Sequence, residues 1–228
     1  FHTISSFVAN TNLQHYSGET GLSYLSQMVV ITFLQFVTAA TGVAACVAII
    51  RGLGGNRLTG LGNFYVDVTR ATLRVFLPLA VLVGTVLLWQ GVPMTFGAAV
   101  KATTLEGAEQ TIARGVVAPE VAIKQLGTNG GGLFGPNSSH PFENPSSFTN
   151  LVSTLAIVVI PMASVWMFGR IVGRMRHATL LFAVMLLLLL AKTGAGLAGE
   201  SSPTQAFGGL PIAQDVGNLE GKELRFGA

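Results

Sequence analysis

The sequence carries little charge for its length. Only 10% of its 228 residues are Asp, Glu, Lys or Arg, whereas 50% are hydrophobic and the mean hydropathy is +0.59. An average soluble domain has about 25% charged residues. The scarcity of charge therefore excludes an ordinary soluble domain, and the high hydrophobicity excludes a disordered chain. The composition indicates a membrane protein.

Cysteine and catalytic motifs are scarce as well. The single cysteine, Cys46, lies in an apolar run, so an intramolecular disulfide is excluded. The sequence contains no Asp-Lys-Thr-Gly phosphorylation motif, no Walker motif and no acid/base constellation. The residues therefore predict no catalytic chemistry in this chain, and whether it counts as part of an enzyme stays open. Because it opens with Phe1 and ends abruptly at Ala228, we expect a fragment.

Four apolar runs approach the length of about 20 residues that crosses a bilayer. They extend over residues 21–50, 75–89, 151–169 and 178–191, and the last one continues toward Leu197. Pro161 is expected to kink the third run. Helices buried in a large soluble core are the alternative, but four such runs in one lightly charged chain favour membrane spans. The sequence predicts an all-α membrane protein.

The arginines predict the orientation of these spans. Residues 51–74 hold four arginines and one aspartate, and residues 170–177 hold three arginines and no acidic residue. The segment 90–150 and the tail from Gly199 are instead slightly acidic. By the positive-inside rule, 51–74 and 170–177 are cytoplasmic loops and the other segments face outward. The basic pI of about 9.4 reports this topology, and we expect no nucleic-acid binding.

The outer segment 90–150 is too long for a plain connection. Within it, residues 118–126 are predicted to form a short helix, because Pro119 suits the first turn and Glu120 complements the positive N-terminal end. A glycine run and then a membrane span follow. This order is typical of a pore loop, in which a helix enters the membrane partway and the chain returns extended beside water.

Glycines at this place suit a potassium ion. Backbone carbonyls select potassium by replacing its hydration shell, and glycine reaches the required backbone angles at little cost. The short helix points its negative end at the cation, and the Thr128 hydroxyl offers either a ligand oxygen or a hydrogen bond within the loop. The predicted potassium-binding residues are Thr128, Asn129, Gly130, Gly131 and Gly132.

Two other interpretations apply to consecutive glycines. One is a flexible linker, and the other is a phosphate-binding loop, whose signature is absent because no Lys-Ser or Lys-Thr pair follows. Residues 137–145 are too specific for a linker, and we expect their polar members to brace the loop by hydrogen bonds. His140 and Glu143 alone are too few for a transition-metal site. The predicted supporting residues are Asn137, Ser139, His140, Glu143 and Asn144.

A similar order of motifs stands at the start of the chain. The pair Thr11-Asn12 precedes the first span much as Thr128-Asn129 precedes the third. The sequence identity between the two segments is slight. The evidence for an internal repeat is therefore their shared order, in which a Thr-Asn motif precedes a membrane span. The predicted potassium site therefore also includes Asn10, Thr11 and Asn12, with support from Gln14, Ser17, Gly18 and Glu19.

These motifs resemble a known family. Ser6-Phe7-Val8-Ala9-Asn10-Thr11-Asn12-Leu13-Gln14 with Tyr16-Ser17-Gly18-Glu19-Thr20 is similar to the first filter region of the potassium-binding subunit of Kdp potassium-transporting ATPases. Residues 126–132 and 137–145 are similar to its second filter region, and residues 219–227 to the segment leading toward its third pore unit. The resemblance covers nearly the whole chain, in order.

The resemblance implies four span–pore loop–span units around one axis, a potassium-transporter or channel fold. Residues 1–50 would end the first unit, 75–169 would form the second, and 178–228 would begin the third. The implied function is uptake of extracellular potassium, the transported ion, through a carbonyl filter in a bacterial plasma membrane. The implied partners are a P-type ATPase subunit and two small membrane subunits. An ATP-independent channel or secondary transporter is the alternative, and a structural scaffold is a third.

Overall fold

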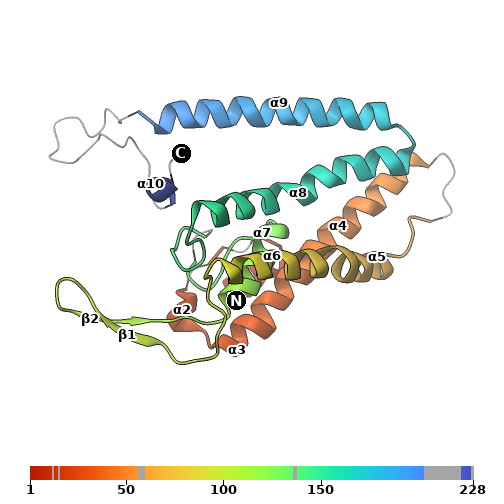
Figure 1. Cartoon of the computed structure of the whole chain (residues 1–228). Helices are drawn as coiled ribbons and strands as arrows, with labels where there is room; N and C mark the ends of the chain where they lie inside the picture. Colours follow the sequence, from red (N-terminus) through yellow and green to blue (C-terminus); the bar gives the residue numbers. More distant parts are fainter. Residues whose placement is uncertain (12, 15, 56–59, 136–137, 203–221, 227–228) are drawn as a thin grey trace. The chain divides into compact units, whose positions relative to one another are not determined.

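Figure 1 shows the computed structural model of the chain, which describes all residues except 12, 15, 56–59, 136–137, 203–221 and 227–228. Two short strands, β1 (Val100–Thr103) and β2 (Glu109–Ile112), lie between α6 and α7. The helices, in chain order, are α1 (His2–Val8), α2 (Gly18–Gly21), α3 (Tyr24–Ser26), α4 (Thr32–Gly54), α5 (Phe64–Ala71), α6 (Leu77–Trp89), α7 (Val117–Leu126), α8 (Ser147–Val172), α9 (Met175–Glu200) and α10 (Lys222–Phe226).

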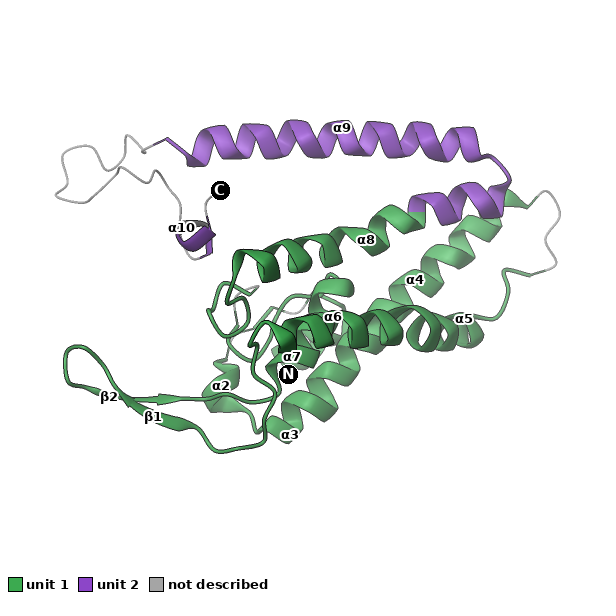
Figure 2. Ribbon diagram, in the orientation of Figure 1, with its two compact units in different colours: residues 1–164 green, residues 165–228 purple. Residues whose placement is uncertain are grey.

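The chain divides into two compact units (Figure 2). The first contains residues 1–164 and holds both glycine- and asparagine-bearing loops of the predicted site. The second contains residues 165–228, with the end of α8, all of α9 and α10. In the second unit, the ring of Trp166 on α8 lies 5.6 Å from that of Phe182 on α9.

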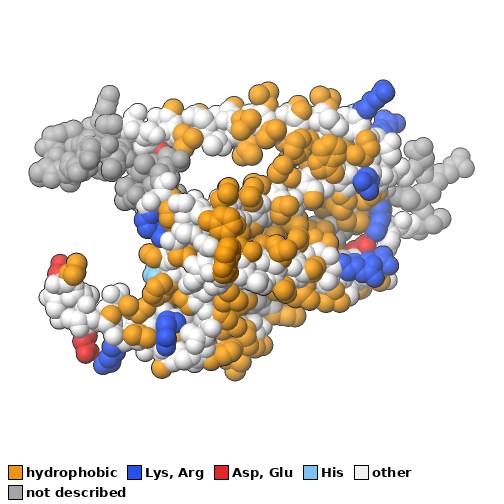
Figure 3. All heavy atoms as spheres, viewed as in Figure 1, with side chains coloured by type: hydrophobic (Ala, Val, Ile, Leu, Met, Phe, Trp, Pro, Cys, Tyr) orange, Lys and Arg blue, Asp and Glu red, His pale blue; other side chains and the backbone are white. Residues whose placement is uncertain are grey.

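Within the described residues, four helical stretches are long and apolar enough to cross a membrane, which agrees with the four predicted spans. Two π-helical turns, Gln27–Ile31 and Thr72–Phe76, complete the first two stretches. Hydrophobic side chains cover the helices and charged side chains are few on the face that Figure 3 shows. The stretches are Tyr24–Gly54, Phe64–Trp89, Ser147–Val172 and Met175–Glu200.

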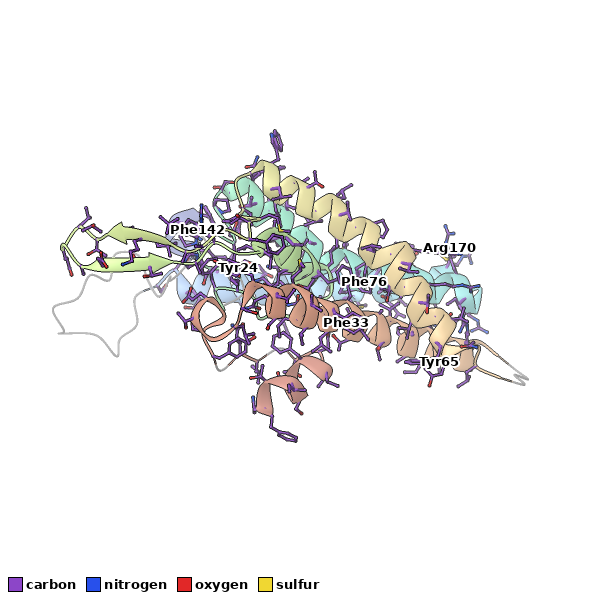
Figure 4. The ribbon with its side chains drawn as sticks, turned by 90° about the horizontal axis from the view of Figure 1, so that it is seen from below. Tyr24, Phe33, Tyr65, Phe76, Phe142 and Arg170 are labelled. Carbon is purple, nitrogen blue, oxygen red and sulfur yellow. The ribbon has the colours of Figure 1, made fainter. Side chains whose placement is uncertain are left out.

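The exposed side chains of these helices suit a lipid environment. Each leucine of the run Leu186–Leu190 in α9 is at least 39% exposed. Figure 4 shows Phe33 and Tyr65 pointing outward, whereas Phe76, only 1% exposed, lies inside. Helix α8 runs without interruption through Pro161, and the kink predicted there stays a prediction.

The loop predicted over residues 51–74 is shorter than expected, because both of its ends are helical. Helix α4 continues to Gly54, and the second stretch begins at Phe64, where the Asn63 side chain accepts a hydrogen bond of 3.2 Å from the Val66 N–H. This bond caps the helix. Arg51 in the last turn of α4 forms an ion pair with Asp67 in the first turn of α5. Two of the charges from which the sequence predicts a loop therefore lie on helices.

The core of the first unit surrounds α7. This helix contacts α6 and α4, and six of its apolar residues are at most 2% exposed. Gly84 on α6 faces Ala118 and Ala122, and a Cβ added at Gly84 would lie 3.7 Å from the Cβ of Ala122. Small residues allow helices to approach closely where lipid provides no hydrophobic drive for association. The short helix is thereby held inside the bundle.

The segment 90–150 also contains a β-hairpin that the sequence did not predict. Strand β1 pairs with β2 in antiparallel register, with Val100 opposite Ile112 and Thr103 opposite Glu109. The residues of both strands are mostly exposed, so the alternation of apolar and polar residues that marks a half-buried strand is missing. Lys101 and Glu109 form an exposed ion pair at 3.3 Å.

Candidate functional site

The short helix predicted over residues 118–126 is present as α7, and it ends in the same backbone turn as α1. Asn10 and Thr128 each stand two residues beyond their helix in the left-handed conformation, with φ of 58° and 53°. In both turns the N–H of the left-handed residue bonds to the carbonyl three residues earlier, and the N–H of the following residue bonds to the carbonyl five residues earlier. These two bonds define a Schellman motif. The bonds are Asn10 N–H to Phe7 O (3.2 Å), Thr11 N–H to Ser6 O (3.0 Å), Thr128 N–H to Gln125 O (3.1 Å) and Asn129 N–H to Lys124 O (2.9 Å).

This match corrects the register of the internal repeat. The two Thr-Asn pairs in the sequence suggest that Thr11 corresponds to Thr128. The turns instead match Asn10 with Thr128 and Thr11 with Asn129, a shift of one residue. The shift arises because the end of the helix fixes which residue must be left-handed, whatever its type. Both helices present their negative C-terminal ends at equivalent points of the two loops.

The loop that follows α1 is called the first loop, and the loop that follows α7 is called the second loop. Side chains join these two loops directly. Asn129, 4% exposed, donates a hydrogen bond through Nδ2 to Asn10 Oδ1, and Asn10 Nδ2 donates to Gly127 O at 3.4 Å. Helix α4 contributes Thr38, whose Oγ1 lies 2.9 Å from Asn10 Oδ1, and Gln35, whose Nε2 donates to Gly130 O at 3.3 Å. The predicted residues Asn10, Asn129 and Gly130 are thus brought together, while Asn12 lies outside the described residues.

The glycine run has unusual backbone angles and a charged support. Gly130, Gly131 and Gly132 have φ of 88°, 73° and 131°, a region that favours glycine. Lys124 donates through Nζ to Gly131 O at 2.9 Å and forms an ion pair with Glu143. The Gly131 carbonyl thus accepts a hydrogen bond from an ammonium group, and potassium binding by the three glycines stays a prediction.

The predicted supporting segment contacts the glycine loop through several side chains. Glu143 Oε1 accepts from Phe134 N–H at 3.3 Å, and the His140 ring stacks on the Phe134 ring with centroids 4.0 Å apart. Asn144 Oδ1 accepts a hydrogen bond of 2.6 Å from Thr149 in α8. Ser139 is half-buried in the same segment. Asn137 lies outside the described residues.

The residues after the first loop support it unequally. Gly18 is buried, and a Cβ there would lie 2.6 Å from Leu133 O, so this glycine allows the two loops to touch. Gln14 donates through Nε2 to Tyr16 O at 3.2 Å. Ser17 and Glu19 are exposed and bond to each other at 2.8 Å. Thr11 is also exposed. Contact with the second loop is therefore made by Gly18 rather than by its two polar neighbours.

Glu120 is buried beneath this arrangement with no hydrogen-bond partner for either carboxylate oxygen among the described residues. Burial raises its pKa to about 8, an effect that Lys124 opposes and Glu143 reinforces. Burial, together with the charge of Glu120, also raises the pKa of Tyr16 to about 12. Glu120 is therefore mostly protonated at neutral pH, and the charged interaction with the start of α7 that the sequence suggests is largely absent.

A cavity of about 190 Å³ lies next to the two left-handed residues. Its wall combines the turns of both loops with apolar side chains of the surrounding helices, and it includes the only cysteine of the sequence. The lining residues are Asn10, Ala39, Gly42, Val43, Cys46, Phe76, Leu126, Gly127, Thr128, Ile160, Pro161 and Ser164.

The sequence is similar to known proteins along its whole length. The sequence model of the family described as Potassium-transporting ATPase A subunit matches residues 1–228. The chain belongs to this family. It is 52% identical over 227 residues to the potassium-transporting ATPase potassium-binding subunit of Pseudomonas aeruginosa, and 46% identical over 228 residues to that of Caldanaerobacter subterraneus subsp. tengcongensis. Each match covers 100% of this chain but only 40% of the relative.

The contributions of α4 and Lys124 to this family member were not predicted from the sequence. Gln35 and Thr38 stand three residues apart within residues 21–50, which carry no charge, and both are at most 9% exposed. Polar residues in such a span usually face the interior of the bundle, so their spacing is a signal that points to the site. Lys124 gives a weaker signal, because a basic residue in the last turn of a helix is common for electrostatic reasons alone.

Proposed function

We propose that this chain forms part of the potassium-binding and translocation path of an ATP-driven potassium uptake pump. The observation that carries the proposal is the repeated turn: α1 and α7 end alike, and their loops are joined by Asn10 and Asn129. Two helix ends of negative polarity at equivalent points favour a cation. The names of the relatives identify potassium as the cation to test.

In this proposal, backbone carbonyls around residues 10–12 and 128–130 replace the hydration shell of the ion. The carbonyl of Gly130 accepts from Gln35 at 3.3 Å, which is longer than the usual 2.9–3.0 Å. A carbonyl oxygen has two lone pairs, so this contact is compatible with ligation. In this proposal, the ion passes from the carbonyls into the cavity beside Asn10 and Thr128.

We further propose that a separate P-type ATPase subunit hydrolyses ATP and that two small membrane subunits complete the complex. The arginine-bearing helix ends then face the cytoplasm of a bacterium. An ATP-independent channel or secondary transporter uses the same filter chemistry and is the alternative. Membership of a family described as an ATPase subunit favours the pump.

The test uses the full-length subunit in its complete complex. Gly130→Ala adds a Cβ at a φ of 88°, which costs about 1–2 kcal/mol and turns a carbonyl. We expect ATP hydrolysis to need roughly tenfold more potassium, because 1.4 kcal/mol is a factor of ten, and to discriminate less against sodium. Titrations of ATPase activity with potassium, rubidium and sodium measure both effects.

Gly107→Ala is the matched control. Gly107 has a similar φ of 83° but lies in the hairpin, with nothing within 4 Å of an added Cβ. Unchanged affinity and ion ranking in Gly130→Ala, with normal assembly, would remove Gly130 from the filter. Potassium flux through the complex without ATP hydrolysis would favour the channel alternative over the pump.

A further inference from the structure

The Lys124–Glu143 ion pair is almost completely buried. Each side chain is 1% exposed, and the two residues come from the last turn of α7 and from the segment that follows the glycine loop. Removing two charges from water is unfavourable unless their geometry is good and further hydrogen bonds satisfy them. The identity of those further bonds therefore indicates what the pair does.

The additional bonds of the pair reach the backbone of the glycine loop. Lys124 Nζ donates to Gly131 O at 2.9 Å, and Glu143 Oε1 accepts from Phe134 N–H at 3.3 Å. One charged group thus holds a carbonyl and the other holds an amide three residues later. The ion pair therefore holds the backbone of residues 131–134 at two points, the Gly131 carbonyl and the Phe134 amide.

Gly132 is shaped to admit this pair. A Cβ at Gly132 would lie 2.6 Å from Lys124 Nζ and 2.8 Å from Glu143 Oε1. Any larger residue would therefore displace the charged ends of these two side chains. This glycine is therefore required for close approach by the support. The three glycines have different roles: Gly130 stays a candidate ligand, Gly131 turns its carbonyl to Lys124, and Gly132 leaves space for the ion pair.

The charges of the pair also matter to a nearby cation. An uncompensated ammonium group beside the loop would repel potassium, and Glu143 cancels that charge in direct contact. Glycine has little conformational preference of its own, so the direction of the Gly131 carbonyl depends on the group that binds it. Loss of Lys124 removes the hydrogen bond that restrains the peptide between Gly131 and Gly132.

We propose that the Lys124–Glu143 ion pair is the positioning device that sets potassium selectivity, by directing the Gly131 carbonyl and holding residues 131–134 behind the filter. This inference rests on the proposed potassium-binding function. Lys124 and Glu143 act through the loop and are positioning residues. Residues that orient the ligands of a bound ion typically change its affinity by about 10- to 100-fold when they are mutated.

The decisive variant is the double substitution Lys124→Met with Glu143→Gln in the full-length subunit and its complete complex. Met keeps much of the lysine length without a donor, and the Gln oxygen still accepts from Phe134 N–H. No buried charge remains unpaired, so the complex should assemble. We expect potassium affinity to fall about 10-fold or more, with a smaller ratio of potassium to sodium affinity, both measured by isothermal titration calorimetry.

Glu143→Gln alone should lower potassium affinity further than the double variant, because it leaves the Lys124 ammonium group uncompensated. The exposed pair supplies the control: Lys101→Gln with Glu109→Gln removes the same two charges from side chains that are 72% and 75% exposed, and it should change neither quantity. An assembled double variant with the affinity and ion ranking of the wild type would overturn the inference. Absence of potassium binding by the wild-type complex would instead overturn the proposed function.

Discussion

The first and second loops begin with the same turn but are supported in different ways. The turn after α1 is held by neutral groups: Ser6 Oγ accepts from Leu13 N–H at 2.7 Å, and Thr38 bonds to Asn10. The turn after α7 has a buried ion pair next to its glycines. The turn is local and follows from where each helix ends, whereas the support is made by residues from elsewhere in the chain.

The difference shows how two sequence segments of slight identity provide similar backbone geometry. Asn10 and Thr128 occupy the left-handed position of the motif, although glycine is the usual residue there. The second loop then continues through three glycines, which need outside restraint, and Lys124 with Glu143 supply it. Variants of the two loops should therefore differ in how strongly they disturb the complex.

The largest effect is expected from Gly132→Ala. Its Cβ would lie 2.6 Å from Lys124 Nζ, and overpacking of this kind typically costs about 1–3 kcal/mol, in addition to strain at a φ of 131°. We expect a lower thermal unfolding temperature of the full-length complex in detergent, or loss of assembly. Gly21→Ala after the first loop is the control, since its Cβ has no neighbour closer than 3.6 Å. Equal unfolding temperatures for both variants would contradict the tight fit of the ion pair.

Such contacts explain how far the sequence predicts this structure. Hydropathy locates four spans, and Pro119 followed by a glycine run locates α7, because these signals act over a few residues. The partners of Lys124 and Gln35 depend on how distant segments pack, so no local pattern contains them. The exposed hairpin was missed because its strands bury no apolar face.

The second-largest effect is a pH dependence specific to the second loop. Glu120 has a pKa of about 8 in the folded protein against an ordinary value of 4.5. Between these values the folded form keeps a proton that the unfolded form has lost, so stability falls as pH rises, by about 1.4 kcal/mol per pH unit. Glu120→Gln cannot titrate and removes this slope.

Unfolding temperatures of the wild-type and Glu120→Gln complexes should therefore diverge from pH 5.5 to 7.5, with the variant more stable at the higher pH. The exposed Glu106→Gln should follow the wild type. Tyr16, next to the first loop, keeps its proton throughout this range because its pKa is about 12. Parallel curves for the wild type and Glu120→Gln would show that Glu120 is already ionised in the folded protein.

The smallest effect tests whether the two loops act together. Asn129 Nδ2 bonds to Asn10 Oδ1, and Asn129 is 4% exposed, so replacing either residue by Ala removes this bond while Thr38 still contacts the residue that remains. Each loss typically costs about 0.5–1.5 kcal/mol. If the bond joins the loops, the double variant should cost less than the sum of the single variants, with a coupling of about 0.5–3 kcal/mol. A double-mutant cycle on the potassium affinity of the complete complex measures this coupling.

Ser17→Ala with Asn129→Ala provides the matched additive pair, because Ser17 is exposed and bonds to Glu19 instead. Strict additivity for Asn10 and Asn129 would mean that the two loops bind the ion independently despite their shared turn.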